Sequence, residues 1–335
     1  MSKTLVTGGT GLVGAHLLYH LIIAGEKPIA LKRPKSNLQN VINIFNFYSK
    51  KGEKLFDEIT WVNCDILDII VLDGIIKNTQ IIYHCAALVS FNNELKNQML
   101  EVNTVGTSNI IDLSLKYNIK QICYVSSIAT LGKNGNLPAD ENTHWSWGNK
   151  SGYAISKYLA EMEVWRGFSE GLNGFIVNPS LIIGPGFRNS GIGTIIKKTL
   201  ISGPFYVSGS CGVIDVNDLT KIMISLMDKK ITNERFIINS EHISYKKLMT
   251  IISTELNRTK PSIQLPQLIL KILICINIIW GKLTGKKIAV SLDTIKYTEK
   301  PFLLDSSKIE KIISHSYIKT SISIKKCIEL FKKNS

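Results

Sequence analysis

Cysteine is scarce in this sequence, and none of it is arranged to bind a metal or to build a disulfide framework. The 335 residues include six cysteines, which lie far apart, without a C-x-x-C pair or a cysteine and histidine cluster at the spacing of a zinc site. We therefore expect reduced thiols, no bound metal and a cytoplasmic location. The first residues, MSKTLVTGG, enter a strand at once, so we expect no signal or transit peptide.

An apolar run long enough to cross a membrane is also missing. The run from Leu268 to Gly281 has 14 residues and contains Lys271 and Asn277, whereas a bilayer-spanning helix needs ~20 apolar residues. The run predicts a buried helix of a smaller domain. Because lysines follow it closely, an interfacial helix is the alternative, with peripheral membrane contact through residues 268–287.

Acidic residues are fewer than basic ones, 26 against 40, which gives a formal net charge of +14. The lysines are scattered along a chain rich in Ile, Lys and Asn, as AT-biased coding would produce. We therefore expect no specific nucleic-acid partner. With 44% hydrophobic residues the chain can bury a sizeable core, which excludes disorder as a whole.

Short apolar runs rich in Val, Ile and aromatic residues alternate with longer helical patterns. This alternation predicts an α/β fold, a Rossmann-type doubly wound parallel sheet with a smaller, mostly C-terminal substrate domain of mixed α/β structure. The pattern loosens after Pro179, so we assign residues 1–179 to the sheet domain and 180–335 to the substrate domain. The segment near 234–240, ERFIINS, predicts one more strand that returns to the sheet.

Three glycines stand at G-x-x-G-x-x-G spacing directly after the first strand, in LVTGGTGLVGAHLL. Gly8 permits a tight turn, Gly11 lets backbone amides approach a pyrophosphate, and Gly14 lets helix and strand pack closely. Phosphates would lie at the helix N-terminus, beside Leu12 and Val13, where the helix dipole favours negative charge. The pattern therefore predicts a bound dinucleotide.

No acidic residue follows the second strand, where a carboxylate would bind the ribose 2′-hydroxyl of NAD. The sequence there is ALKRPK, with Lys32 and Arg33. Two cations suit a 2′-phosphate, so NADP(H) is the expected cofactor and NAD(H) is the alternative.

Later strand ends complete the expected cofactor site. Asp65 ends the third strand, where it could bond the adenine amino group, and the small residues Ala86 and Ala87 end the fourth, where they leave room for the cofactor. Pro179 ends the last strand of the sheet domain. His84, beside the alanines, is interpreted as a structural strand-end residue rather than a catalyst.

The order of these motifs carries a family resemblance. T-G-x-x-G-x-x-G, CDILD, HCAALVSF, VNTVGTSNIID, YVSSIATLG, YAISK, NPSLIIGPG and VIDVNDL follow one another in this chain. It resembles the extended short-chain dehydrogenase/reductase family, also called the NAD-dependent epimerase/dehydratase family, over roughly residues 3–250. The basic end of its second strand is similar to that of the NADP-dependent dihydroflavonol reductase and 3β-hydroxysteroid dehydrogenase-like members.

The resemblance implies a catalytic set. Tyr153 would be the general acid/base, and Lys157, one helical turn on, would stabilise the tyrosinate and bond the nicotinamide ribose. Ser127 would polarise the substrate carbonyl; it is preferred to Ser126 because its distance to Gly132 matches the family pattern. Asn103 resembles a family asparagine whose role is mainly structural.

Departures from the family pattern narrow the reaction. Ile128 and Ala129 stand where the sugar-nucleotide dehydratases carry an Asp-Glu pair, which disfavours removal of water. Leu181 and Gly186 replace an asparagine and an arginine that serve the substrate diphosphate in the sugar-nucleotide enzymes, although Arg188 remains as an anion partner.

We therefore expect an NADP(H)-dependent oxidoreductase that interconverts a carbonyl and a secondary alcohol on an apolar or ring-containing small molecule. Trp145 and Trp147 would roof that substrate or merely pin their loop, and Asp215 would brace the substrate domain. The alternatives are a sugar-nucleotide epimerase or a related enzyme, and a non-catalytic NAD(P)-binding protein. The resemblance also implies a homodimer through a helix pair.

Overall fold

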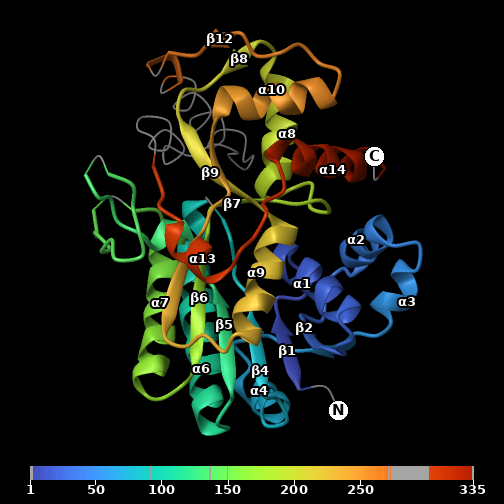
Figure 1. Ribbon diagram of the computed structural model, residues 1–335, viewed down its shortest axis with the longest axis vertical. Helices are drawn as coiled ribbons and strands as arrows, with labels where there is room; N and C mark the ends of the chain where they lie inside the picture. Colours follow the sequence, from blue (N-terminus) through green and yellow to red (C-terminus); the bar gives the residue numbers. More distant parts are fainter. Residues whose placement is uncertain are drawn as a thin grey trace.

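A seven-stranded parallel sheet lies at the centre of the computed structural model, which describes residues 3–272 and 302–333 apart from 91, 136, 149, 267 and 271 (Figure 1). Its strands run in the order β10-β6-β5-β4-β1-β2-β3. Their bounds are Thr4–Thr7 for β1, Ile29–Lys32 for β2, Thr60–Asn63 for β3, Ile81–His84 for β4, Gln121–Val125 for β5, Gly174–Pro179 for β6 and Glu234–Ile238 for β10. The strand order reverses between β1 and β4, where the ligand crevice of a doubly wound sheet lies.

Helices cover both faces of this sheet. One face packs against α1 (Leu12–Ile23), α2 (Gln39–Tyr48) and α9 (Val216–Asp228), and the other against α4 (Ile69–Ile76), α6 (Gly106–Lys116) and α7 (Gly152–Ser169). Because neighbouring residues of a strand point to opposite faces, Val6 belongs to the first core and Leu5 to the second. Strands buried on both faces explain the continuous apolar runs in the sequence.

A smaller unit lies beyond the carboxyl ends of the strands (Figure 1). It contains a three-stranded sheet of β7 (Leu181–Ile183), β9 (Ser210–Asp215) and β11 (Glu241–Ser244), and a two-stranded sheet of β8 (Phe205–Tyr206) and β12 (Ile263–Gln264). The helices α8 (Gly191–Ser202), α10 (Tyr245–Glu255) and α14 (Thr320–Lys333) surround a separate apolar core with the three-stranded sheet. The expected Rossmann-type sheet with a smaller, mostly C-terminal companion is confirmed.

Two segments beyond residue 180 lie with the large sheet. β10 pairs with β6 in parallel, as the sequence pattern indicated for 234–240. α9, which the sequence division assigned to the substrate domain, packs beside α1 in the sheet core. The chain therefore passes between the two units more than once.

Short elements connect the larger ones. They are α3 (Gly52–Phe56), η1 (Asn93–Leu95), α5 (Lys96–Leu100), the π-helical turn η2 (Glu101–Val105), the 3₁₀ turn η3 (Ile128–Thr130) and α13 (Ser307–Ile312). Within the described residues no helix is long and apolar enough to span a membrane, and no group of three His, Cys, Asp or Glu side chains is placed to hold a metal. Of residues 268–287, to which the sequence assigned a buried or interfacial helix, residue 271 and residues 273–287 lie outside the described part.

Candidate active site

At two positions, Gly8 and Gly14, the turn between β1 and α1 has no room for a side chain. Gly8 has φ +66°, and a Cβ there would lie 2.6 Å from the backbone nitrogen of Ala86 in the loop after β4. A Cβ on Gly14 would lie 2.2 Å from the carbonyl oxygen of Gly8. The first and third glycines of the motif therefore let the turn approach the neighbouring loop and the helix approach the strand.

Gly11 serves a different purpose, because its surroundings are less crowded than those of Gly8 and Gly14. A Cβ there would meet only the Gly8 carbonyl oxygen, at 3.3 Å, within 4 Å. As the N-cap of α1, Gly11 provides no side-chain acceptor for the first-turn N–H groups, which include those of Leu12 and Val13. A side chain would occupy the space that a pyrophosphate needs, so the turn fits a dinucleotide.

The other expected cofactor residues lie at the same edge of the sheet. Lys32, half-buried, is the last residue of β2, and the exposed Arg33 follows it. Asp65 follows β3, and its Oδ1 accepts a hydrogen bond from the Leu67 N–H at 3.0 Å. The remaining residues are the half-buried Ala86, the exposed Ala87 and the buried Pro179 at the end of β6.

Asn103 fixes the loop after β4. Its Oδ1 accepts a hydrogen bond from the Leu88 N–H at 2.7 Å, and its Nδ2 donates to the Leu88 carbonyl at 3.0 Å and to the Ser156 Oγ on α7 at 2.9 Å. This buried amide joins the loop beside the cofactor turn to the helix that carries Tyr153. Its contacts agree with the structural role that the sequence suggested.

The two serines after β5 have different partners. Ser126 is buried, and its hydroxyl donates to the carboxylate of Glu161 at 2.5 Å. Ser127 is half-buried, and its Oγ accepts a hydrogen bond from the Ala129 N–H at the start of η3. The Ser127 hydroxyl proton can still be donated to a substrate oxygen, which supports its choice over Ser126.

Tyr153 and Lys157 lie one turn apart on α7, as the spacing predicted. The helix starts at Ser151, whose side chain accepts a hydrogen bond from the Ala154 N–H. Tyr153 is half-buried, whereas Lys157 is only 2% exposed. The Lys157 Nζ donates to the Tyr124 hydroxyl and to the Val125 carbonyl, each at 2.7 Å.

Burial controls the charge of Lys157. Loss of hydration lowers the pKa of its ammonium to about 7, against the opposing effects of the Glu161 carboxylate and Cys85. Near neutral pH the lysine is therefore only partly protonated, so the groups that hold its ammonium matter for its charge. The helix thus places Tyr153 and Lys157 on one face, and their role as a proton-handling pair remains a prediction.

Glu161 is a central buried residue that the sequence reasoning missed. Its carboxylate is fully buried and receives hydrogen bonds from Ser126, from Thr130, from Asn178 on β6 at 2.9 Å and from Arg235 on β10 at 3.0 Å. These bonds join α7 to the segment after β5 and to the strands β6 and β10. They therefore fix the position of α7, and with it of Lys157, relative to the sheet. The only sequence signal was a glutamate one turn after that lysine.

The tryptophan loop packs against the outside of α7. The Trp145 ring stacks on the Tyr158 ring, with centroids 4.3 Å apart and planes at 9°, and Trp147 meets both rings edge-on. The Lys150 Nζ lies 4.4 Å from the Trp145 ring centroid. These contacts pin the loop to the helix, the second of the two roles that the sequence left open.

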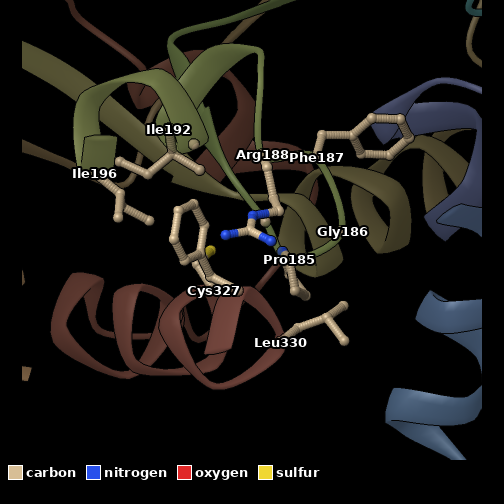
Figure 2. Close-up of a pocket in the computed structure, with 11 residues that line it drawn as sticks. Pro185, Gly186, Phe187, Arg188, Ile192, Ile196, Cys327 and Leu330 are labelled. Carbon is tan, nitrogen blue, oxygen red and sulfur yellow. The ribbon is translucent and has the colours of Figure 1, made fainter. Parts of the chain in front are cut away.

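Arg188 lies in a small pocket between the segment after β7 and the C-terminal helix α14 (Figure 2). Its guanidinium is 4.2 Å from the ring centroid of Phe331. Figure 2 shows Arg188 in this pocket together with Ile192, Ile196 and Cys327. The arginine that remained as a diphosphate partner is thus held against α14.

Asp215 joins the two units of the fold. It is buried at the end of β9, and its Oδ1 accepts hydrogen bonds from the backbone and side-chain nitrogens of Asn217 at 2.7 and 2.9 Å. Asn217 in turn bonds Tyr48 on α2 and His20 on α1. The bracing role expected for Asp215 agrees with these contacts.

Known proteins are similar to this chain over most of its length. Sterol demethylase protein B of Methylococcus capsulatus is 26% identical over 268 residues, which cover 78% of this chain and 77% of that protein. A putative dihydroflavonol 4-reductase of Synechocystis sp. is 29% identical over 323 residues, or 90% of this chain and 87% of that protein.

The same fold occurs in the UDP-glucose 4-epimerase of Thermotoga maritima, solved with UDP-glucose. The two structures superpose with a TM-score of 0.76 and 19% identity over 99% of both chains. A model of the NAD dependent epimerase/dehydratase family matches residues 4–239. Its members are NAD(P)-dependent oxidoreductases and epimerases. The chain belongs to this NAD-dependent epimerase/dehydratase family, within the extended short-chain dehydrogenases/reductases.

Proposed function

We propose that this protein is an NADP(H)-dependent oxidoreductase that interconverts a carbonyl and a secondary alcohol on an apolar or ring-containing small molecule. The observation that carries the proposal is the buried Lys157, held by two neutral oxygen acceptors one helical turn after Tyr153. Simple binding of a dinucleotide does not require a buried ammonium beside a phenol, and burying a charge is costly. The non-catalytic alternative leaves this cost unexplained.

Each catalytic side chain has a separate task. The nicotinamide cofactor, when bound, supplies or receives the hydride. In the reducing direction Tyr153 gives its phenol proton to the substrate oxygen, and Ser127 donates a hydrogen bond to the same oxygen. The positive charge of Lys157 stabilises the tyrosinate left behind, since an opposite charge nearby lowers the pKa of a phenol.

The end of β2 supports NADP(H) over NAD(H). Lys32 and Arg33 are accessible where the adenosine ribose of a bound dinucleotide would lie, and no carboxylate follows the strand. A 2′-phosphate would gain two cationic partners there. The 2′-hydroxyl of NAD would lack the carboxylate that usually accepts its hydrogen bond.

Three features support an apolar substrate over a sugar nucleotide. Ile128 and Ala129 follow Ser127, so no acid/base pair for removing water stands there. Leu181 and Gly186 provide no diphosphate ligand, and Arg188 packs against Phe331. Two relatives that match most of the chain are named after dihydroflavonol and sterol, which are both ring compounds, although others are UDP-glucose 4-epimerases.

The test is a comparison of substrates in one assay. Purified protein is mixed with NADPH and a panel of ring-containing ketones and aldehydes, and oxidation of the cofactor is followed by absorbance. The same preparation is incubated with UDP-glucose, and formation of UDP-galactose is measured. We expect carbonyl-dependent NADPH oxidation and no epimerisation. Interconversion of the two UDP-sugars without carbonyl reduction would favour the alternative function, a sugar-nucleotide epimerase. The UDP-glucose 4-epimerase of similar fold is the reason for including this substrate.

Peripheral membrane contact is a further part of the proposal. At the tip of the smaller unit Phe205 and Ile263 are exposed cross-strand partners of β8 and β12, and Leu268, Ile269 and Ile272 are exposed nearby in sequence. We expect flotation with anionic vesicles of phosphatidylserine and phosphatidylcholine, weakened by Phe205→Ser with Ile263→Ser. Ile70→Ser on α4 removes a more exposed apolar side chain elsewhere and is the control. Unchanged flotation in the double variant would contradict this contact.

A further inference from the structure

A row of polar side chains crosses the apolar face of the sheet under α6 and α7. Thr7, His84 and Tyr124 are register partners on the adjacent strands β1, β4 and β5. All three are fully buried. Their neighbours on this face, Leu5 and Ile82, belong to the core. Polar groups in such a place are costly unless they are hydrogen-bonded, so each of these side chains is expected to have a hydrogen-bond partner.

Hydrogen bonds link the row in a fixed order. The Ala86 N–H donates to the Thr7 hydroxyl oxygen at 3.1 Å, and Thr7 contacts the His84 Nδ1 at 2.7 Å. His84 Nε2 lies 2.9 Å from the Thr107 hydroxyl on α6, and Thr107 also hydrogen-bonds the Tyr124 hydroxyl. Since the Ala86 N–H can only donate, Thr7 is free to donate its own proton to Nδ1. We assign the tautomer of His84 that carries its proton on Nε2 and donates it to Thr107.

Burial keeps the imidazole and the phenol of this row uncharged. It lowers the pKa of His84 to about 3, with the nearby Lys157 acting in the same direction. It raises the pKa of the Tyr124 phenol far above its ordinary value. The row is therefore a chain of neutral donors and acceptors.

The row ends at the ammonium of Lys157. The Tyr124 hydroxyl and the Val125 carbonyl both accept from Nζ at 2.7 Å, and Nζ lies 4.3 Å from the Tyr124 ring centroid. An ammonium can only donate, so the phenol presents an oxygen lone pair to it, with Thr107 as the second partner of the hydroxyl. Titratable groups from three elements surround this ammonium and its phenol partner. They are His84 on β4 with Cys85 after it, Tyr124 on β5, and Tyr153 and Glu161 on α7.

We propose that Tyr124 is a positioning residue for the reaction, whose hydroxyl holds the Lys157 ammonium in place for Tyr153 while Thr107, His84 and Thr7 orient that hydroxyl. This inference rests on the proposed function and deepens it. A carboxylate partner would hold the ammonium too, but it would cancel much of the charge that Tyr153 needs. Neutral acceptors hold the ammonium by hydrogen bonds and do not cancel its positive charge, which can then act on Tyr153.

The test is Tyr124→Phe, which removes one oxygen and keeps the ring. Tyrosinate formation is followed by near-ultraviolet absorbance during a pH titration, in each protein and in the same protein with Tyr153→Phe, so that the difference isolates Tyr153. In the wild-type chain we expect Tyr153 to titrate below an ordinary tyrosine. In Tyr124→Phe the ammonium loses an acceptor and is less populated, so the Tyr153 transition moves up by about one pH unit.

Tyr83→Phe is the matched control. Like Tyr124, Tyr83 is buried, but it lies on β4 and packs in the core on the opposite face of the sheet. We expect its Tyr153 transition to stay at the wild-type pH. A Tyr153 transition unchanged by Tyr124→Phe overturns the inference and leaves the proposed function standing. An ordinary tyrosine titration in the wild-type chain contradicts the proposed function itself, and the inference with it.

A second pair of variants tests the role of the row if Tyr124→Phe fails to fold. Thr107→Val breaks the link between His84 and the Tyr124 hydroxyl, and we expect an upward shift of the Tyr153 transition smaller than that of Tyr124→Phe. Thr104→Val makes the same change one turn earlier, at a buried hydroxyl that has no hydrogen-bond partner among the described residues. Equal titrations in these two variants would show that the row does not orient Tyr124.

Discussion

The two halves of the site are built in opposite ways. The turn between β1 and α1 depends on missing side chains, because Cβ atoms at Gly8 and Gly14 would collide with backbone atoms. The α7 half depends on buried polar side chains, because Lys157 is held by Tyr124 and Glu161 is held by several side-chain donors. The first half therefore binds through its backbone, and the second acts through charges whose environment is set by residues far apart in the chain.

The largest effect on folding is expected in the glycine turn. Gly14→Ala places a methyl group 2.2 Å from the Gly8 carbonyl oxygen, so α1 must shift; we expect a loss of about 2–3 kcal/mol in the free energy of unfolding. Urea denaturation measures this loss, and fluorescence titration should show weaker NADPH binding. Gly74→Ala is the control, since nothing lies within 4 Å of a Cβ there. Equal stability of the two variants would contradict the claim that the turn depends on the absence of side chains.

A smaller effect is expected at the end of β2, where the cofactor half does depend on side chains. Lys32→Ala with Arg33→Ala removes the two cations offered to a 2′-phosphate, so NADPH affinity should fall about tenfold or more while NADH affinity changes little. Fluorescence titration with both cofactors measures the ratio. Lys27→Ala, an exposed lysine before the other end of β2, serves as the control. Wild-type protein that binds NADH more tightly than NADPH would contradict the cofactor assignment.

A further effect is a pH dependence of stability that comes from Lys157. Its pKa is lowered to about 7 in the folded chain from an ordinary 10.5, so between these values the unfolded chain binds more protons. Stability from this group therefore rises with pH across that window and is least below about pH 7. In Lys157→Met this dependence disappears. We expect the stability of the wild type relative to the variant to increase from pH 7 to 10, as measured by urea denaturation; a difference independent of pH would show that Lys157 is not held as described.

The same contrast explains what the sequence could predict. The parallel sheet, the glycine turn and the Tyr153–Lys157 pair depend on local spacing, and the structure places them as expected. The Glu161 cluster and the Thr7–His84–Tyr124 row depend on strand register, which joins residues 77 positions apart in the first pair. Nothing local marks these residues as partners, because a buried threonine or tyrosine in a strand looks like any other core position.

Interpretation of the tryptophan loop shows the same limit. Aromatic residues near Tyr153 suggested a wall over the substrate, but their orientation depends on which face of α7 the loop meets. Tyr158, one position after Lys157, points to another side of the helix and stacks with Trp145. A single step along the helix therefore separates the residues of the site from those that anchor the loop.

The central claim is that the phenol of Tyr153 moves the proton that accompanies hydride transfer. The most direct measurement is the rate of carbonyl-dependent NADPH oxidation in Tyr153→Phe, with Tyr158→Phe as the matched control on the same helix and NADPH affinity measured in both. We expect Tyr153→Phe to bind NADPH normally and to lose at least ~100-fold in turnover, while Tyr158→Phe stays near the wild-type rate. Turnover in Tyr153→Phe equal to that of Tyr158→Phe would contradict the account.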